Sequence, residues 1–426
     1  MRIQRTFDRN PSNVVEWGNG IPFAARIASH VRTAGPPLFI LVLLSAVSPL
    51  ATDLYTPAFP AMAVSLVASE ASIQLTFSAF IIGMGVGQFL VGPISDGVGR
   101  RPFLIAGTVL FVVFSVLCAL ADSASMLILW RLLLGFSGAA CIVMARATIS
   151  DVFTPELAGP RFATVAAIQS IAPVIGPMVG AVILIFGDWR TIFFVIAGIG
   201  LVMVVGVLAL MPESLPKERR SGVSLRDNGH RVRDLLRNRP FIGYVATSCL
   251  ACAGFFTYIA GAPLVLHSVF GLSEQQYGLF FAVNALGMAA MISVLRLLSR
   301  RMRTERLLVI GLIIAVVFTA ALLVQSVLQF ESLAGVWICL FGLTCSIGFV
   351  NPSGLILSQR AGRVHAGTAA ALHGGLQFTS GALASPITGV FGHSTLLPMA
   401  VAMFTFMVLA LVSNRIGTRL NGAAAR

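Results

Sequence analysis

Charged side chains are scarce in this chain. Asp, Glu, Lys and Arg make up 11% of its 426 residues, whereas 57% of the residues are hydrophobic. Soluble domains carry about 25% charged residues, and the mean hydropathy of this chain is high, at +0.91. One soluble core could not bury that much apolar surface. The scarcity of charge therefore excludes an ordinary water-soluble protein and indicates a chain that is largely embedded in a lipid bilayer.

Several chemical signatures are also missing. The chain has no G-x-x-x-x-G-K-[ST] loop to hold nucleotide phosphates. Outside segment 212–240, no stretch between the apolar runs has room for a catalytic or nucleotide-binding domain. No cluster of His, Asp or Glu, which would mark a membrane enzyme or a metal site, stands at the end of an apolar run. We therefore expect no enzymatic activity, no ATP, no cofactor and no metal.

Long apolar stretches dominate what is present. Twelve of them, at roughly 18–25 residues each, are long enough to cross a bilayer. Six precede and six follow the polar segment 212–240, and equal halves around one linker indicate duplication, a frequent transporter design. The expected fold is an all-α membrane protein of twelve helices in two pseudo-symmetric bundles, 36–211 and 241–414. The approximate bounds of the spans are 36–58, 72–94, 103–121, 125–147, 163–186, 190–211, 241–264, 276–298, 307–328, 334–357, 367–391 and 395–414.

The placement of basic residues predicts the orientation. The net charge of +13 comes from Lys and Arg in the tails and in alternate loops, above all in segment 212–240, whereas Arg131 and Arg190 are the only basic residues expected in the opposite half. Cytoplasmic loops carry such an excess. We expect a multi-pass protein of the bacterial inner membrane, with the arm 1–35 and the tail 415–426 both in the cytoplasm. No soluble domain carries a basic patch, so nucleic acid is not an expected partner.

Ionisable residues inside the spans are rare and are therefore candidates for function. Asp53 in the first span and Arg131 in the fourth lie at similar depth, roughly 8 Å below the outer surface at 1.5 Å rise per residue. We expect them to meet in a central cavity, where the carboxylate holds or releases a proton depending on solvent access and occupancy. The alternative is a fixed structural ion pair. Arg146 and Asp151 lie at the cytoplasmic end of the fourth span.

A second candidate is the loop between the second and third spans. It reads Gly92-Pro-Ile-Ser-Asp96-Gly-Val-Gly99-Arg100-Arg101. Glycines at both ends allow a tight turn, and a carboxylate at Asp96 can accept hydrogen bonds from a helix N-terminus. Arg100 can pair with Asp96 and with Asp151. The alternative is a short basic turn that only sets topology.

This loop resembles the G-x-L-a-D-r-x-G-r-r signature of the major facilitator superfamily, with Gly97 where that family usually has Arg. In that family the signature latches the two halves together on the cytoplasmic side. The resemblance therefore implies that Asp96, Arg100 and Asp151 form such a latch. It covers the chain from about residue 36 to residue 414.

Further motifs resemble one branch of the superfamily. In the fifth span, Gly176-Pro177-Met-Val-Gly180 is similar to the G-P-x-x-G of proton-coupled antiporters. Physically, Pro177 removes a backbone hydrogen bond and the glycines permit a bend and close packing, so an ordinary proline kink is the alternative. Asp53-Leu-Tyr55-Thr-Pro57-Ala-Phe-Pro60 resembles the D-x-Y-x-P-x-x-P of bicyclomycin- and chloramphenicol-resistance exporters. In that branch the carboxylate faces the cavity.

Six other residues are candidates to line the cavity: Tyr55, Gln74, Tyr258, Asn284, Gln377 and Phe378. Polar residues serve equally as interhelical glue, which is the alternative for them. The resemblance implies a monomeric, proton-coupled exporter of drugs or other small molecules, with protons, cargo and lipid as its partners. A proton-coupled importer or exporter of one metabolite, on the same fold, stays open. A non-transporting membrane enzyme or sensor and a channel are the alternatives from other classes.

Overall fold

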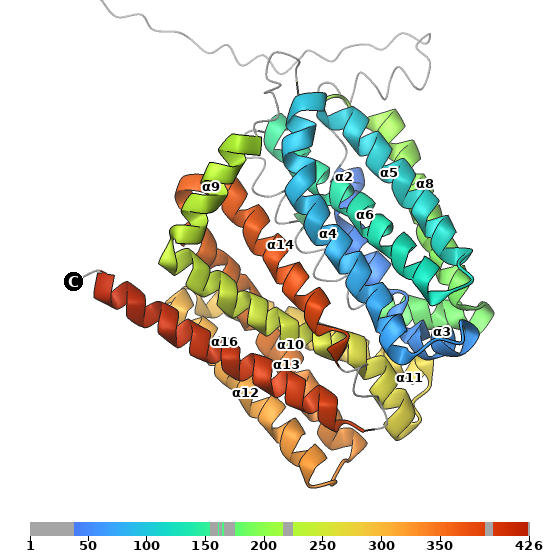
Figure 1. Ribbon diagram of the computed structural model, residues 1–426, viewed down its shortest axis with the longest axis vertical. Helices are drawn as coiled ribbons and strands as arrows, with labels where there is room; N and C mark the ends of the chain where they lie inside the picture. The colour runs from blue at the N-terminus through green and yellow to red at the C-terminus, as the bar shows by residue number, and fades with distance from the viewer. Residues whose placement is uncertain are drawn as a thin grey trace, which may run out of the picture.

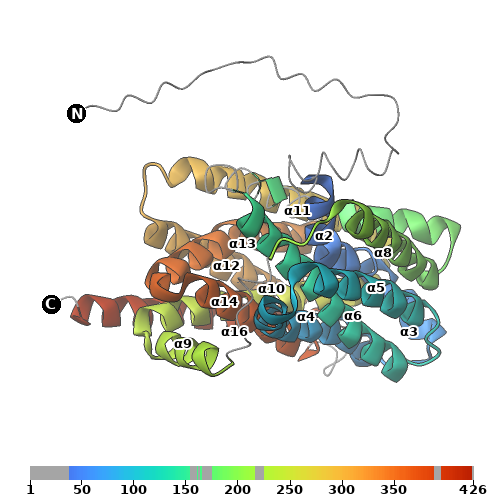
Figure 2. The same ribbon diagram turned by 90° about the horizontal axis from the view of Figure 1, so that it is seen from above.

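The computed structural model describes residues 38–153, 161, 164–165, 175–215, 225–387 and 395–424. Regular structure in this part of the chain is entirely helical, with no strand. Two groups of helices, one from each half of the sequence, lie side by side (Figures 1 and 2). The all-α fold predicted from the apolar stretches is confirmed.

The N-terminal group begins with α2 (Leu38–Asp53), η1 (Thr56–Ala58) and α3 (Phe59–Ser65) and continues with α4 (Glu70–Val98), α5 (Arg100–Ala119), α6 (Ala124–Val152), a helix over Ile175–Phe186 and α8 (Trp189–Leu210). The C-terminal group comprises α10 (Arg239–Phe270), α11 (Glu274–Leu298), α12 (Thr304–Val327), α13 (Leu333–Ala361), η3 (Arg363–His365), α14 (Ala366–Ala384) and α16 (Leu397–Ala424). In the sequence, α9 (Leu225–Arg237) comes between the two groups.

Ten helical segments of the described chain, counting Leu38–Ser65 as one, are long and apolar enough to cross a membrane. The shorter apolar helix Ile175–Phe186 and α14 fall on the two remaining predicted spans. The described helices are therefore consistent with twelve spans. Several extend past their predicted ends, as α10 does with 32 residues over Arg239–Phe270.

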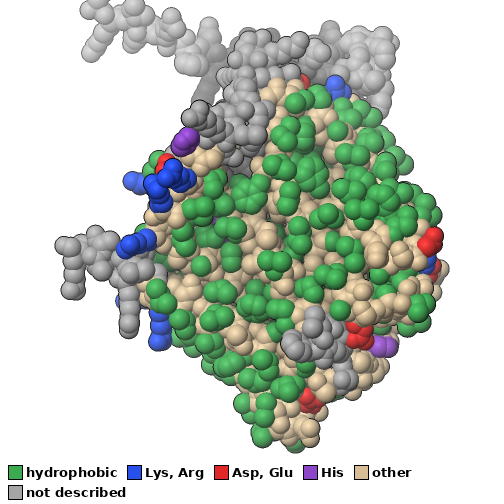
Figure 3. Space-filling model, in the orientation of Figure 1, with side chains coloured by type: hydrophobic (Ala, Val, Ile, Leu, Met, Phe, Trp, Pro, Cys, Tyr) green, Lys and Arg blue, Asp and Glu red, His purple; other side chains and the backbone are tan. Residues whose placement is uncertain are grey.

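The surface fits a protein embedded in lipid. Hydrophobic side chains cover most of the face in Figure 3, whereas Lys and Arg gather mainly at the margin near α9 and at the turn between α4 and α5. Asp and Glu lie mainly toward the opposite end, near α3 and α11. An apolar belt between charged ends matches a bilayer with a polar interface on each side.

Two segments outside the predicted bundles are helical. In segment 212–240, expected to be a polar linker, α9 repeats apolar residues at helical spacing and buries Leu235 in a small cluster with Phe241 and Leu372. Because this cluster belongs to α9, α10 and α14, the helix is attached to the C-terminal group. At the other end, α16 continues through most of the predicted tail 415–426. The arm 1–35 lies outside the described residues.

The first span is broken beside its acidic residue. Because proline lacks a backbone N–H and its ring clashes with the preceding turn, α2 ends at Asp53, ahead of Pro57 and Pro60, which occupy the first turns of η1 and α3. The hydroxyl of Thr56 donates to the backbone carbonyl of Asp53 at 3.1 Å. The two prolines thus place the Asp53 carboxylate at the end of a helix.

Candidate transport cavity

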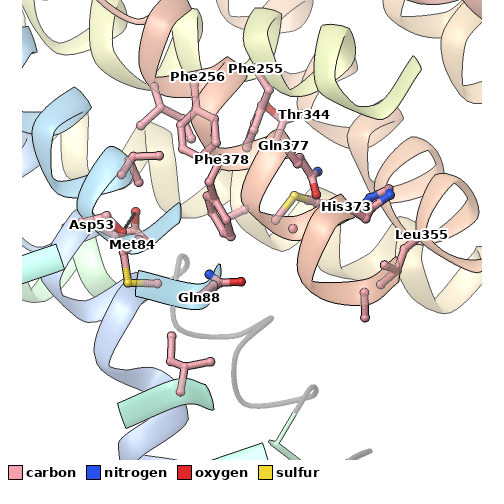
Figure 4. Close-up of a pocket in the computed structure, with 18 of the residues that line it drawn as sticks. Asp53, Met84, Gln88, Phe255, Phe256, Thr344, Leu355, His373, Gln377 and Phe378 are labelled. Atoms are coloured by element: carbon pink, nitrogen blue, oxygen red, sulfur yellow. Dashed lines mark hydrogen bonds between the residues drawn. The ribbon is translucent and has the colours of Figure 1, made fainter. Parts of the chain in front are cut away.

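A cavity of about 1020 Å³ lies between the two helical groups. Its walls come from α2, α4 and α6 on one side and from α10, α11, α13 and α14 on the other. In Figure 4, Asp53, Met84 and Gln88 lie across the cavity from Gln377 and Phe378 of α14. Most of the lining is apolar or aromatic with a few polar groups, which is the usual composition of a small-molecule site.

Asp53 lies at the wall of this cavity, as expected. Its side chain is 6% exposed and accepts a hydrogen bond from the hydroxyl of Thr52 at 3.2 Å. Among the described residues, it forms no ion pair with Lys or Arg. The carboxylate is therefore placed where it can contact a molecule in the cavity.

The predicted antiporter motif packs directly on the backbone that carries Asp53. A Cβ atom added to Gly176 would come within 2.7 Å of the Cβ of Asp53, and one added to Gly180 would overlap the carbonyl oxygen of Leu54. Pro177 lies at the contact between the two helical groups, since its carbonyl oxygen would be 3.0 Å from a Cβ added to Gly278 of α11. The motif therefore sits between Asp53 and the opposite half.

Arg131 does not meet Asp53 in the cavity. The fully buried guanidinium donates from Nη1 to the carbonyl oxygen of Ala51 at 2.9 Å and from Nε to that of Thr76 at 3.5 Å. Its Cζ lies 4.0 Å from the ring centroid of Tyr55 and 4.3 Å from that of Phe80. The expected meeting fails because the carbonyls and rings around Arg131 hold it behind the cavity wall, where it ties α2 to α4.

Tyr55 and Gln74 were expected in the cavity lining, and both lie away from it. The Tyr55 hydroxyl is 3.3 Å from that of Thr76, and its ring lies against Arg131. Gln74 donates from Nε2 to the carbonyl oxygen of Ala260 in α10, at 3.1 Å. Both side chains are fully buried because they join helices to each other. These two residues therefore serve as contacts between helices, which was the alternative interpretation.

The other four candidates do line the cavity. Asn284 donates to the hydroxyl of Tyr258 at 2.9 Å and accepts from the indole N–H of Trp337 at 3.0 Å. The Tyr258 ring stacks on Phe281 with the centroids 6.1 Å apart and an interplanar angle of 11°. These contacts fix an aromatic wall in the C-terminal half. On α14, Gln377 donates to Asn351 at 3.2 Å, and Phe378 lies beside it.

The predicted latch has its described contacts within the N-terminal half. Gly99 ends α4 with a φ of 115°, a region open mainly to glycine. Arg100 then pairs through Nε with Asp151 at 3.1 Å and donates to Ser95, while Arg101 donates to the carbonyl oxygen of Leu208 at 3.1 Å. The side chain of Asp96 and the surroundings of Gly92 lie outside the described residues.

Sequence reasoning missed the carboxylate that caps α5. Glu213 accepts from the backbone N–H of Arg100 at 2.9 Å and from that of Arg101 at 3.4 Å. Negative charge at a helix N-terminus is favourable, but nothing in the sequence brings residue 213 next to residue 100. Several lining residues were missed as well, Met84 and Gln88 among them. Arg146, which the sequence marked only as an ionisable residue at a span end, also lines the cavity. For Gln88, its presence as a polar residue inside an apolar span was the available signal.

A helical membrane protein whose two halves enclose a central cavity has the architecture of a transporter rather than an enzyme. Comparison with known proteins defines the class further. The profile of the Major Facilitator Superfamily matches residues 41–386, and the chain belongs to this superfamily.

Two relatives are similar to this chain over most of its length. The chain is 34% identical to an uncharacterized MFS-type transporter, YdgK, of Bacillus subtilis (strain 168) over 373 residues, which is 87% of this chain and 92% of that protein. It is 27% identical to a bicyclomycin resistance protein homolog of Haemophilus influenzae (strain ATCC 51907 / DSM 11121 / KW20 / Rd), with 88% of this chain and 95% of that protein covered.

Solved structures agree on the fold. A bacterial homolog of the human lysosomal transporter Spinster, described as inward-facing and unoccupied, superposes with a TM-score of 0.71 at 14% identity and covers 94% of this chain and 98% of its own. A D-xylose-proton symporter superposes with a TM-score of 0.69 at 14% identity, covering 88% and 96%. The family assignment made from the motifs is confirmed, and membership of this superfamily identifies the chain as a transporter rather than an enzyme.

Proposed function

We propose that this chain exports drugs or other small molecules from the cytoplasm in exchange for protons. It acts as a monomer in the bacterial inner membrane, with both termini in the cytoplasm. The observation that carries the proposal is the position of Asp53, a carboxylate inside a membrane span, at the cavity wall and without a described cationic partner. Ionisable groups in such places are costly and are kept for function. The bicyclomycin-resistance relative supports export of drugs.

Alternating access supplies the transport step. Contacts between the halves lie at the end that carries η1 and α11, where Gln74 bonds to Ala260 and Pro177 lies against Gly278. They continue along α4 and α14, where Phe89 packs on Gly375. At the other end the lining residues Arg146 and Gln359 are exposed. This arrangement supports a state open to the cytoplasm. Rocking of the halves about the cavity then opens the η1 end and closes the other.

The proton step follows from this geometry. In the outward-open state a proton from outside neutralises Asp53, and the halves rock; cytoplasmic cargo then enters and displaces the proton. One positive charge moving inward across 100 mV releases about 2.3 kcal/mol, and each factor of ten in concentration costs about 1.4 kcal/mol. Together with the pH gradient, one proton thus sustains roughly tenfold to hundredfold accumulation of an uncharged cargo.

Vesicles of both orientations test the direction of transport. We expect a panel of labelled drugs to enter everted vesicles that contain the protein, and not right-side-out vesicles, when a proton gradient is applied. Cells that express the protein are expected to tolerate higher concentrations of the transported drugs, and cells that express Asp53→Asn are not. Proton-driven accumulation of a single metabolite in right-side-out vesicles would favour the importer instead.

A further inference from the structure

A second charged side chain, Arg146 of α6, lines the cavity, and the proton step does not use it. The side chain is exposed to the cavity space. Within the part of the chain that the structure describes, its guanidinium has no ion-pair partner and donates no hydrogen bond; the contact from the Ser150 hydroxyl goes to its backbone carbonyl. When this end of the cavity closes during the transport cycle and water leaves, a guanidinium without a partner becomes unfavourable unless something else binds it.

Arg146 belongs to a region of the cavity separate from Asp53. On α6 it lies 15 residues beyond Arg131, which at 1.5 Å per residue is about 22 Å along the helix. The guanidinium of Arg131 bonds to Ala51, two residues before Asp53, so Arg131 marks the depth of the carboxylate. An intramolecular pair between Asp53 and Arg146 is therefore out of reach, and each charge must be matched by something else.

The surroundings of the two charges differ. Near the Tyr258 end, the wall consists of aromatic rings such as Phe255, Phe256 and Phe281. Arg146 is accompanied by uncharged hydrogen-bonding residues from the same ends of their helices, Ser150 of α6 and Gln359 of α13, which also line the cavity. The cavity thus has an apolar aromatic part and a polar entrance that carries one positive charge.

We propose that Arg146 is a binding site for an anionic oxygen group of the cargo, such as a carboxylate, whose apolar body extends toward the aromatic wall. The inference rests on the proposed function, because the occupant is the exported molecule. The guanidinium presents five N–H donors in a planar fork that matches carboxylate geometry, and hydrogen bonds between charged groups are the strong ones. Ser150 and Gln359 add neutral donors and bring no competing negative charge.

A matched pair of probes tests the site: 4-phenylbutyrate, an aromatic carboxylate, and 4-phenylbutyramide, its uncharged counterpart. Binding to the purified full-length protein in a neutral detergent is measured by isothermal titration calorimetry. The wild type is expected to bind the carboxylate about tenfold more tightly than the amide. Arg146→Gln is expected to remove that preference and to leave amide binding within about twofold, while Arg146→Lys keeps part of the preference because it keeps the charge.

The matched control is Arg300→Gln, at an exposed arginine between α11 and α12 that does not line the cavity; it is expected to leave both affinities unchanged. Three results would overturn the site: equal affinities in the wild type, an equal loss for both probes in Arg146→Gln, or the same loss in Arg300→Gln. Competition separates an amphiphilic cargo from a small ion. Displacement of 4-phenylbutyrate by an equal concentration of inorganic phosphate would also overturn it.

The proposed function fails by a different measurement. Calorimetry is done without a proton gradient and reports on Arg146, whereas proton coupling is read in vesicles with Asp53→Asn and any transported drug. Equal affinities of the wild type for the two probes, together with intact proton-driven export, would refute the anion site alone.

Discussion

At the scale of single residues, the position of Asp53 depends on the glycines that pack against it, because a glycine has no side chain to keep the two backbones apart. Gly176 and Gly180 let the fifth-span helix approach the backbone of Asp53 and Leu54 closely. The sequence motif and the acidic residue, which lie more than a hundred positions apart, thus form one unit in space. Any enlargement of the glycines must push Asp53 or the helix that carries it.

Gly176→Ala and Gly180→Ala are therefore expected to destabilise the protein by about 1–3 kcal/mol each, the usual cost of overpacking, and to lower transport. The measurement is thermal unfolding of the detergent-purified protein together with vesicle uptake. Gly198→Ala is the matched control: it is a helical glycine of the same half with nothing within 4 Å of an added Cβ. If Gly176→Ala behaved like Gly198→Ala in both assays, the close contact with Asp53 would be refuted.

A separate prediction concerns Arg131, whose guanidinium donates hydrogen bonds to backbone carbonyls and lies against aromatic rings. Arg131→Lys keeps the charge but cannot reach the carbonyls of Ala51 and Thr76 while lying across the rings of Tyr55 and Phe80. We expect a loss of about 2 kcal/mol or more in stability, since buried acceptors are left unpaired. If Arg131→Lys unfolded at the wild-type temperature, a positive charge at this position would be enough for stability, and the hydrogen bonds to the two carbonyls would not be needed.

Residue chemistry alone predicted that Asp53 is at the cavity, because an acid in an apolar span has few other uses. It could not predict which polar residues face the cavity. Gln74 and Gln88 lie 14 positions apart on α4, close to four helical turns, yet Gln74 bonds to α10 and Gln88 lines the cavity. The difference comes from the crossing of α4 with the opposite half, which no local pattern records.

At the scale of elements, lengths and breaks in the spans were predictable, and caps from distant segments were not. Hydropathy located the described spans, and the prolines after Asp53 explain the end of α2. In contrast, α5 starts on a carboxylate, Glu213, from the segment after α8. This contact joins the start of the polar segment 212–240 to the N-terminus of α5, directly after Gly99.

Glu213→Ala is expected to loosen the first turn of α5, because the backbone N–H groups of Arg100 and Arg101 lose their acceptor. Loss of such a cap costs about 1 kcal/mol, so amide hydrogen exchange there should be roughly fivefold faster. Mass spectrometry of the corresponding peptides measures it. Glu305→Ala, in the first turn of α12 in the other half, is the control. Unchanged exchange at Arg100 and Arg101 would contradict the capping role.

At the scale of the whole molecule, the two halves are in contact at the η1 end and along α4 and α14, and the cavity lies between them. The hydroxyls of Ser78 on α4 and Ser385 after α14 bond to each other across the halves. Alternating access requires this contact to break in every cycle. The contact therefore offers a place to stop the cycle without touching the cavity.

The double variant Ser78→Cys, Ser385→Cys is expected to form a disulfide under oxidising conditions, since the side-chain oxygens that the sulfur atoms would replace are in direct contact. The cross-link holds the η1 end closed, so vesicle transport should fall to background and return when the disulfide is reduced. Each single variant controls for the six native cysteines. Full transport by the oxidised, cross-linked protein would rule out rocking of the halves at this contact.

The most direct test of the account is a measurement of proton movement driven by cargo. Vesicles containing the purified protein and a trapped pH-sensitive dye are given a transported drug in the absence of any other gradient. The wild type is predicted to move protons opposite to the drug, and Asp53→Asn, which inserts and folds normally, is predicted to move none. Drug-driven proton movement of wild-type size in Asp53→Asn would contradict the central claim that this carboxylate carries the proton.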